Sequence, residues 1–354
     1  MINIDGSHGE GGGQILRTAL AFSALTQQAV KIENIRQNRP TSGLKPQHLS
    51  GVTAAEKLCN AEVKGAEIGS KIVEFLPKKI EGQTLSVNIG TAGSVTLLLQ
   101  SLLLPSFFAD KKVRIKLTGG TDVSMSQPVD YFKNVFMPHI QEFCEKIELE
   151  LGSRGYYPKG NGKIELHIAP KYKLSDYSSF SEFLKDIKTK TNPIKRIEQG
   201  NIISLHGISH ASNDLKKAEV AERQAKSARI LLGKYGVPIK IESEYCETLS
   251  TGSGITLWAN FSSGAIMGAD SLGARGKRAE IVGQEAAQNL AEEISSKAPI
   301  DHHLGDQLLP FMALTQNSSI KVSKIINHMK SNIHVIEKFL GKCFEIKENV
   351  INIV

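Results

Sequence analysis

One order of elements recurs three times along this chain, and it limits the folds that the sequence can adopt. A strand pattern leads into apolar helical stretches, and each set closes with two further strands. The three sets span residues 2–75, 85–168 and 279–354. Because strands alternate with helices and each unit offers an apolar helix pair to one sheet face, the pattern predicts an α/β fold. We expect three repeated strand-helix-strand-helix-strand-strand units to form one large domain.

Two stretches fall outside this order. Residues 199–276 contain a shorter set of strand patterns around one helical pattern, which indicates a small inserted α/β domain. Residues 170–199 are polar and rich in Lys, Ser and Asp, which is typical of a boundary excursion on the surface. We therefore predict a large catalytic domain made from residues 1–198 and 277–354, with the small domain inserted between them.

Composition limits the setting in which the chain works. The apolar run from Val95 to Phe108 is interrupted by Gln100 and is too short to span a bilayer, so we expect no membrane association and a cytoplasmic protein. The four cysteines lie far apart with no CxxC pair, which argues against a zinc site or a disulfide framework. The net charge of +7 favours a polyanionic partner such as RNA.

The segment from Asp5 to Arg17 places five glycines between a short strand and a helix with almost no polar face. Free backbone N–H groups at the start of a buried helix suit an anion such as phosphate. Glu10 would repel a bare phosphate, so we predict that it binds a divalent cation that accompanies the phosphate. Arg17 can hold a phosphate oxygen with its guanidinium. A tight turn without a ligand, with a solvated Glu10, is the alternative.

Two later loops carry groups of the same kind. Arg36 and Arg39 follow the second strand of the first set, with Gln47 a short turn further on, and guanidinium groups at this place suit phosphate oxygens. The small residues Gly90 to Ser94 again precede a buried helix, in which Gln100 is a lone amide that needs a polar partner. Simple surface charge and a satisfied core glutamine are the respective alternatives.

His328 is the candidate nucleophile. It lies between the strand and helix patterns of the third set, at a place that matches those of Arg36 and Gly119 in the other two sets. Loops that occupy equivalent places in repeats are predicted to meet over one sheet edge. A neutral imidazole nitrogen can attack phosphorus and form a phosphoramidate. A helix-capping or buried structural histidine is the alternative.

Several of these segments together resemble the RNA 3'-terminal phosphate cyclase family. The resemblance rests on at least five motifs in family order, which include Glu10-Gly-Gly-Gly-Gln-Ile-Leu-Arg, Ile-Arg-Gln-Asn-Arg at 35–39, and Asn-His-Met-Lys-Ser-Asn-Ile at 327–333. It implies an enzyme that uses ATP to convert an RNA 3'-phosphate to a 2',3'-cyclic phosphate, through a covalent histidine-AMP and then an RNA-adenylate. The implied cofactor is a divalent metal, magnesium or manganese, and the implied partners are ATP and RNA 3' ends.

The resemblance also implies a role for each matching residue. His328 would be the adenylylated histidine, with Arg17 and Glu10 as its catalytic neighbours and Glu10 as metal ligand. The implied contacts to the RNA end are Arg36, Arg39 and Gln47. Those implied for the nucleotide are Gln100, Pro128, His303, Leu304, Gly305, Asp306 and Gln307. His303 stands where the family has a tyrosine, so less ring area would stack on adenine. Neighbouring histidines on a helix point apart, so we do not predict a metal site at His302 and His303.

Two rival functions remain at the level of sequence. One is a non-catalytic cyclase-like RNA-processing protein, which would lack the nucleophile that His328 supplies here. The other is an enolpyruvyl-type transferase, which shares the repeated α/β unit but needs no nucleophilic histidine. Incubation with ATP labelled on the α-phosphate separates these possibilities.

Overall fold

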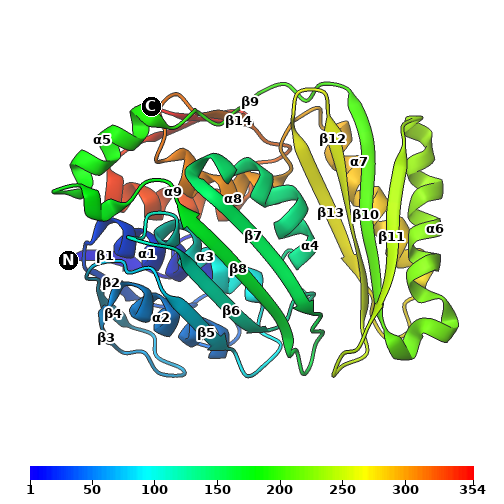
Figure 1. Cartoon of the computed structure of the whole chain (residues 1–354), viewed down its shortest axis with the longest axis horizontal. Helices are drawn as coiled ribbons and strands as arrows, with labels where there is room; N and C mark the ends of the chain where they lie inside the picture. The colour runs from blue at the N-terminus through cyan, green and yellow to red at the C-terminus, as the bar shows by residue number, and fades with distance from the viewer.

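The computed structural model describes residues 1–354 and confirms the α/β class: the strands form four four-stranded sheets with helices packed against them (Figure 1). The first sheet has the order β1-β2-β4-β3, in which β1 runs parallel to β2 and the other neighbours are antiparallel. Its elements are β1 (Ile2–Asp5), α1 (Gly13–Thr26), β2 (Val30–Glu33), α2 (Pro46–Cys59), β3 (Glu62–Lys64) and β4 (Val73–Leu76). Apart from Gly13, every residue of α1 is buried, which its apolar sequence predicts.

The second sheet repeats this arrangement with the order β5-β6-β8-β7 and one parallel pair, β5 with β6. Its elements are β5 (Thr84–Asn88), α3 (Val95–Ser106), β6 (Val113–Gly119), α4 (Val129–Tyr131), β7 (Cys144–Ser153) and β8 (Gly162–Pro170). The sequence pattern over residues 129–147 favours one continuous helix. The chain instead leaves α4 through a π-helical turn and two 3-10 turns, and β7 already begins at Cys144. Pro138 lacks the N–H that a continuing α-helix needs.

The third sheet has the order β15-β16-β14-β9, again with one parallel pair, β9 with β14. Its elements are β9 (Lys195–Arg196), α8 (His302–Met312), β14 (Ser319–Lys321), α9 (Asn327–Leu340), β15 (Phe344–Lys347) and β16 (Val350–Ile353). Strand β9 lies within residues 170–199, which we predicted to be a surface excursion. The same stretch holds α5 (Phe180–Lys190), whose Phe183 and Ile187 are buried. The segment thus contains regular elements that we did not predict, and its place at a domain boundary stays a prediction. A two-residue strand is too short to leave a periodic pattern.

The fourth sheet has the order β11-β10-β12-β13 and lies at one end of the molecule, beside the second sheet (Figure 1). Its elements are β10 (Ile202–Ser212), α6 (Val220–Leu232), β11 (Ile239–Cys246), β12 (Ser253–Phe261), β13 (Ile266–Leu272) and α7 (Ala279–Ser295). The remaining 3-10 turns are Leu174–Asp176, Asn213–Ala218 and Gly233–Tyr235.

Helix α7 belongs with this fourth sheet. We assigned it to the third repeat, but it packs on α6, β12 and β13, and its Val282, Ala286 and Leu290 lie in a hydrophobic cluster separate from the larger one that joins the other three sheets. Periodicity shows that a helix has a buried face but does not show which sheet covers it. The division of the chain at residues 198 and 276 into two domains stays a prediction, and this packing extends the fourth sheet's core to residue 295. No helix is long and apolar enough to cross a membrane.

Candidate functional site

One cleft of about 810 Å³ collects most of the predicted site residues. Its walls come from all three repeats and from β13 of the fourth sheet. The predicted residues that line it are Glu10, Arg17, Arg36, Arg39, Gln47, Gln100, His303, Asp306 and His328. The structure thus brings together loops from both ends of the chain, which follow strands β2, β6 and β14 in their respective sheets.

His328 is the second residue of α9, and its imidazole faces this cleft between two carboxylates. Its Nε2 lies 3.0 Å from Oε2 of Glu10, and its Nδ1 lies 3.9 Å from Oδ2 of Asp306. The first distance allows a hydrogen bond, whereas the second is too long for one and leaves only electrostatic attraction. The side chain is 37% exposed, so a ligand in the cleft can reach the ring.

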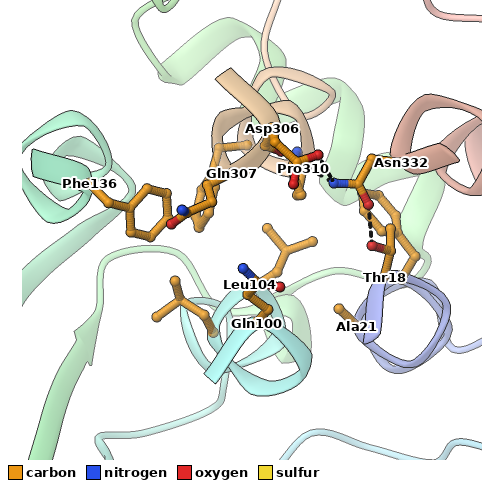
Figure 2. A pocket seen from close by; sticks show the side chains of 12 residues that line it. Thr18, Ala21, Gln100, Leu104, Phe136, Asp306, Gln307, Pro310 and Asn332 are labelled. Carbon is orange, nitrogen blue, oxygen red and sulfur yellow. Dashed lines mark hydrogen bonds between the residues drawn. The ribbon is translucent and has the colours of Figure 1, made fainter. Parts of the chain in front are cut away.

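Asp306, on α8, connects the helices that surround the histidine. Its carboxylate accepts hydrogen bonds from Gln14 Nε2 at 2.8 Å and from Asn332 Nδ2 at 2.8 Å, and Asn332 in turn accepts from the Thr18 hydroxyl (Figure 2). Gln14 also donates to the backbone carbonyl of His328 at 3.1 Å. Burial raises the pKa of Asp306, and the opposing effects of His328 and of these hydrogen bonds are smaller. Helices α1, α8 and α9 are therefore tied together beneath the imidazole.

Arg17 is a buried cation without an ion-pair partner. Its Nε donates to Oε1 of Gln100 at 2.9 Å, and none of the ion pairs in the structure includes it. Burial lowers the pKa of Arg17 to about 10, with Asp306 acting in the opposite direction, so the guanidinium stays charged at neutral pH. Gln100, which we predicted to contact a nucleotide, lines the cleft and orients Arg17 through its amide oxygen; the nucleotide contact stays a prediction. A desolvated, uncompensated cation on the floor of a cleft attracts an anion strongly.

The residues predicted for the RNA end form one side of the cleft. Arg39 Nη2 lies 3.2 Å from Oε2 of Glu10, which places this carboxylate between a guanidinium and the imidazole. Arg36 Nη1 donates to two backbone carbonyls of the following turn, at 2.6 and 3.1 Å. Gln47 Oε1 accepts from the Ser94 N–H at 2.8 Å. Gln47 therefore joins the first repeat to the Gly90–Ser94 loop of the second.

The residues predicted for the nucleotide divide into two groups. His303 and Asp306 line the cleft, and burial lowers the pKa of His303 to about 3, so its ring is neutral at pH 7. Gln307 lies at a narrow neighbouring cavity, where it faces Gln100 and Phe136 (Figure 2), and it donates to Gln127. Pro128, Leu304 and Gly305 are buried and do not line the cleft. Gly305 allows close packing, since a Cβ there would lie 2.6 Å from Val322.

Sequence reasoning missed two residues of this site. Asn332 lies one turn after His328 on the buried face of α9, and a polar residue at that spacing was a usable signal. Asp270 comes from β13 of the fourth sheet and lines the cleft opposite the first repeat. Burial raises the pKa of Asp270 to about 7. Nothing in the local pattern around Asp270 distinguishes it from an ordinary strand residue.

Comparisons with known proteins agree with the resemblance found in the sequence. The family model described as RNA 3'-terminal phosphate cyclase matches residues 8–346. The chain is 47% identical over 350 residues to the RNA 3'-terminal phosphate cyclase of Pyrococcus abyssi, which covers 99% of this chain and 96% of the relative. It is 46% identical over 352 residues to the protein of that name from Archaeoglobus fulgidus, with 99% of each chain covered. The chain therefore belongs to the RNA 3'-terminal phosphate cyclase family.

Proposed function

We propose that this chain, as a member of that family, uses ATP to convert an RNA 3'-phosphate into a 2',3'-cyclic phosphate, with His328 as the nucleophile. The observation that carries the proposal is the placement of His328 Nε2 at the surface of a cleft whose floor holds the uncompensated cation of Arg17. A nucleophile beside a site for an anion is the arrangement that attack on phosphorus requires.

In the first step, Nε2 of His328 attacks the α-phosphorus of ATP. The attacking imidazole is neutral and carries its proton on Nδ1, toward Asp306, so the Nε2 contact with Glu10 is released before the attack. A nitrogen–phosphorus bond forms, the bond to the bridging oxygen breaks, and pyrophosphate leaves. Arg17 is placed to neutralise the negative charge that grows on the phosphate oxygens, and it needs no reorganisation because Gln100 already orients it. Asp306, near Nδ1, favours the imidazolium character that develops during attack.

In the second step, an oxygen of the RNA 3'-phosphate attacks the phosphorus of the histidine-bound AMP. The nitrogen–phosphorus bond breaks, and the histidine returns to its starting state. Arg36 and Arg39 are the cations on the side of the cleft where this second phosphate would enter. Their guanidinium groups suit phosphate oxygens, and we propose that they hold the RNA end.

In the third step, the neighbouring ribose 2'-OH attacks the 3'-phosphorus and expels AMP. One oxygen–phosphorus bond forms, another breaks, and the hydroxyl proton passes to solvent or to a carboxylate in the cleft. The step is intramolecular, so proximity favours it strongly. The adenylate matters because AMP leaves more easily than an oxide or hydroxide would.

A divalent metal fits the donor set at Glu10. The carboxylate lies in the cleft beside the nucleophile, and its contacts with Arg39 and His328 both go to Oε2. Oε1 thus stays available, and Mg²⁺ commonly binds through one carboxylate together with substrate phosphates. We propose Glu10 as the protein ligand of magnesium or manganese, which would supply further neutralisation of phosphate charge. Glu10 also holds the imidazole by hydrogen bonding and balances the charge of Arg39.

Labelling the protein with ATP that carries a radioactive α-phosphate tests the proposal directly. We expect a covalent, acid-labile and base-stable label, as a phosphoramidate gives, and we expect its transfer to an RNA that ends in a 3'-phosphate. Absence of label with either magnesium or manganese would contradict the catalytic assignment and would favour a non-catalytic relative that binds RNA.

A further inference from the structure

An exposed aromatic residue stands at the mouth of the cleft, and neither the motifs nor the proposed chemistry accounts for it. Tyr157 lies in the turn between β7 and β8, lines the cleft, and is 77% exposed. Met125 lines the same cleft from the segment after β6 and is 87% exposed. These are the two most exposed large apolar side chains in the chain. Single exposed apolar side chains are common on protein surfaces, so the feature that points to binding is the position of these two in the cleft.

The turn that carries Tyr157 is held more firmly than an exposed loop requires. Arg154, three residues earlier, is fully buried and binds Asp122, Asp130 and Glu244 at distances of 2.6 to 3.2 Å. The preceding residue, Tyr156, is buried as well, and its hydroxyl lies 2.7 Å from Nδ1 of His210.

The far side of the turn is equally constrained. The Lys159 N–H donates to the Ser250 hydroxyl at 3.1 Å, and a Cβ on Gly160 would lie 2.7 Å from the backbone of Ala92. Ala92 is itself part of the cleft wall. The second repeat and the fourth sheet thus clamp the turn from both sides, while the tyrosine ring and the Lys159 side chain point away from this packing into solvent. The hairpin between β7 and β8 can be followed to its contact with the fourth sheet in Figure 1.

A rigid platform with an exposed aromatic ring and a cation beside it is suited to one class of ligand. Single-stranded nucleic acid is bound by stacking its bases on aromatic side chains while basic side chains follow its phosphates. The platform adjoins the wall that carries Arg36, Arg39 and Gln47, and the chain has a net charge of +7. Because the backbone of the turn is already held in place, ordering it on binding costs little conformational entropy.

We propose that the Tyr157–Lys159 turn is the docking platform for the single-stranded RNA just upstream of its 3' end, with Tyr157 stacked on one base and Lys159 contacting a phosphate. The proposal rests on the proposed function, because it takes the RNA end to lie in this cleft. It also assigns a role to the buried Arg154 network and to the fourth sheet, which together hold the platform in place. Stacking tolerates any base, so the platform binds RNA without selecting a sequence.

The test compares RNA binding with self-adenylylation in the full-length chain. For Tyr157→Ala, we expect the Kd for a fluorescent single-stranded RNA 3'-phosphate, measured by anisotropy, to rise by roughly 5- to 150-fold, the range for loss of one stacked base. The KM for RNA should rise in parallel, while labelling by α-labelled ATP is unchanged. Tyr157→Phe keeps the ring and should bind RNA as the unchanged protein does. Ile230→Ala, an exposed apolar residue on α6, is the matched control.

An abasic scan locates the contact. Removing the stacked base from the RNA should raise the Kd for the unchanged protein as much as Tyr157→Ala does. In the Tyr157→Ala variant, the abasic RNA and the complete RNA should bind with the same Kd. Lys159→Ala should lower the slope of log Kd against log salt by about 0.7, as expected for one phosphate contact on a single strand.

Three results would overturn the platform: an unchanged Kd for Tyr157→Ala, an equal loss of self-adenylylation and RNA binding, or an abasic penalty that is the same with and without the tyrosine. Failure of the proposed function looks different. In that case no label forms at His328, whereas RNA binding still depends on Tyr157.

Discussion

Two clusters of charged side chains in this protein contain the same residue types but have different roles. At the cleft, Glu10 lies between Arg39 and His328, and Asp306 lies on the other side of His328. In the interior, Asp122 and Asp130 bind Arg154, and Asp122 also contacts His210. The interior guanidinium makes close contacts with three carboxylates, and the side chains of Arg154, Asp122 and Asp130 are at most 5% exposed. The side chains of His328 and Glu10 are 37% and 38% exposed, and Arg17 has no carboxylate partner.

The two clusters differ in burial and in whether every nearby cation has a carboxylate partner. The interior cluster even offers Asp122, Asp130 and His210 within 4.8 Å of one another, a spacing that suits a metal ion. Arg154 already supplies the positive charge there, so the cluster works as a structural joint. The cleft is open and also holds Arg17 and Arg36, two cations without a carboxylate partner, which leaves it able to bind phosphate. Identical residue types therefore hold the fold in one place and support chemistry in the other.

Removing the nucleophile should give the largest effect. We expect His328→Ala to reduce labelling by α-labelled ATP by at least about 10⁴-fold, because it removes the imidazole that contacts Glu10 in the cleft. Its thermal stability should be nearly unchanged, since the side chain is half-exposed. His167→Ala, a histidine of similar exposure on β8, is the control and should label normally. Persistent labelling of His328→Ala would remove this residue from the mechanism.

Substitution in the interior cluster should change the free energy of unfolding and not the labelling. We expect Arg154→Met to lower the free energy of unfolding by about 3–5 kcal/mol, because Asp122 and Asp130 are left buried without a counter-charge. Arg114→Met breaks a half-exposed ion pair with Glu165 and should cost at most about 1 kcal/mol. Urea unfolding measures both. Equal losses in the two variants would mean that burial does not distinguish the interior cluster from a surface pair.

Glu10 separates two roles within the cleft. For Glu10→Gln, we expect the magnesium or manganese concentration that gives half-maximal labelling to rise roughly 10- to 100-fold, because a carboxylate ligand is lost while the side-chain shape is kept. Glu33→Gln, on β2 outside the cleft, controls for the change in net charge. If metal dependence stays the same, Glu10 acts only through its contacts with His328 and Arg39.

Asp270 lies in the cleft but has no cation partner. Substitution of Asp270 should give the smallest effect of these predictions, and the effect should appear in the pH dependence of the free energy of unfolding. Burial raises the pKa of Asp270 from the ordinary value of 3.8 to about 7. The unfolded carboxyl ionises at lower pH than the folded one, so the folded state binds more protons between these values and is destabilised as pH rises. The expected loss is at most about 1.4 kcal/mol per pH unit.

Chemical unfolding of Asp270→Asn and of the unchanged protein from roughly pH 4.5 to roughly pH 6.5 tests this prediction. This pH range lies between the pKa values of the unfolded and the folded carboxyl group. We expect the variant to lose less stability than the unchanged protein as the pH rises. Parallel stability profiles would show that Asp270 ionises near its ordinary pKa.

Much of the local structure could be predicted from the sequence, because it depends on short-range pattern. The apolar helix that became α1 and the strand that became β6 follow directly from periodicity, and so does the α/β class. Prediction failed where a long-range partner decides the outcome. Strand β9 exists only because β14 pairs with it, and α7 joined the fourth sheet because that sheet offered the apolar face nearest to it.

The same division applies to the candidate site. The sequence by itself determined which residues have the chemistry for phosphate transfer, since a glycine turn with Glu10 and Arg17 and a histidine at a strand-to-helix junction can be recognised locally. Only the tertiary structure decided that Glu10 and His328 touch, that Gln100 orients Arg17, and that Asp270 and Tyr157 complete the cleft. These contacts join segments far apart in the chain, and their energies depend on burial and charge that no local pattern contains.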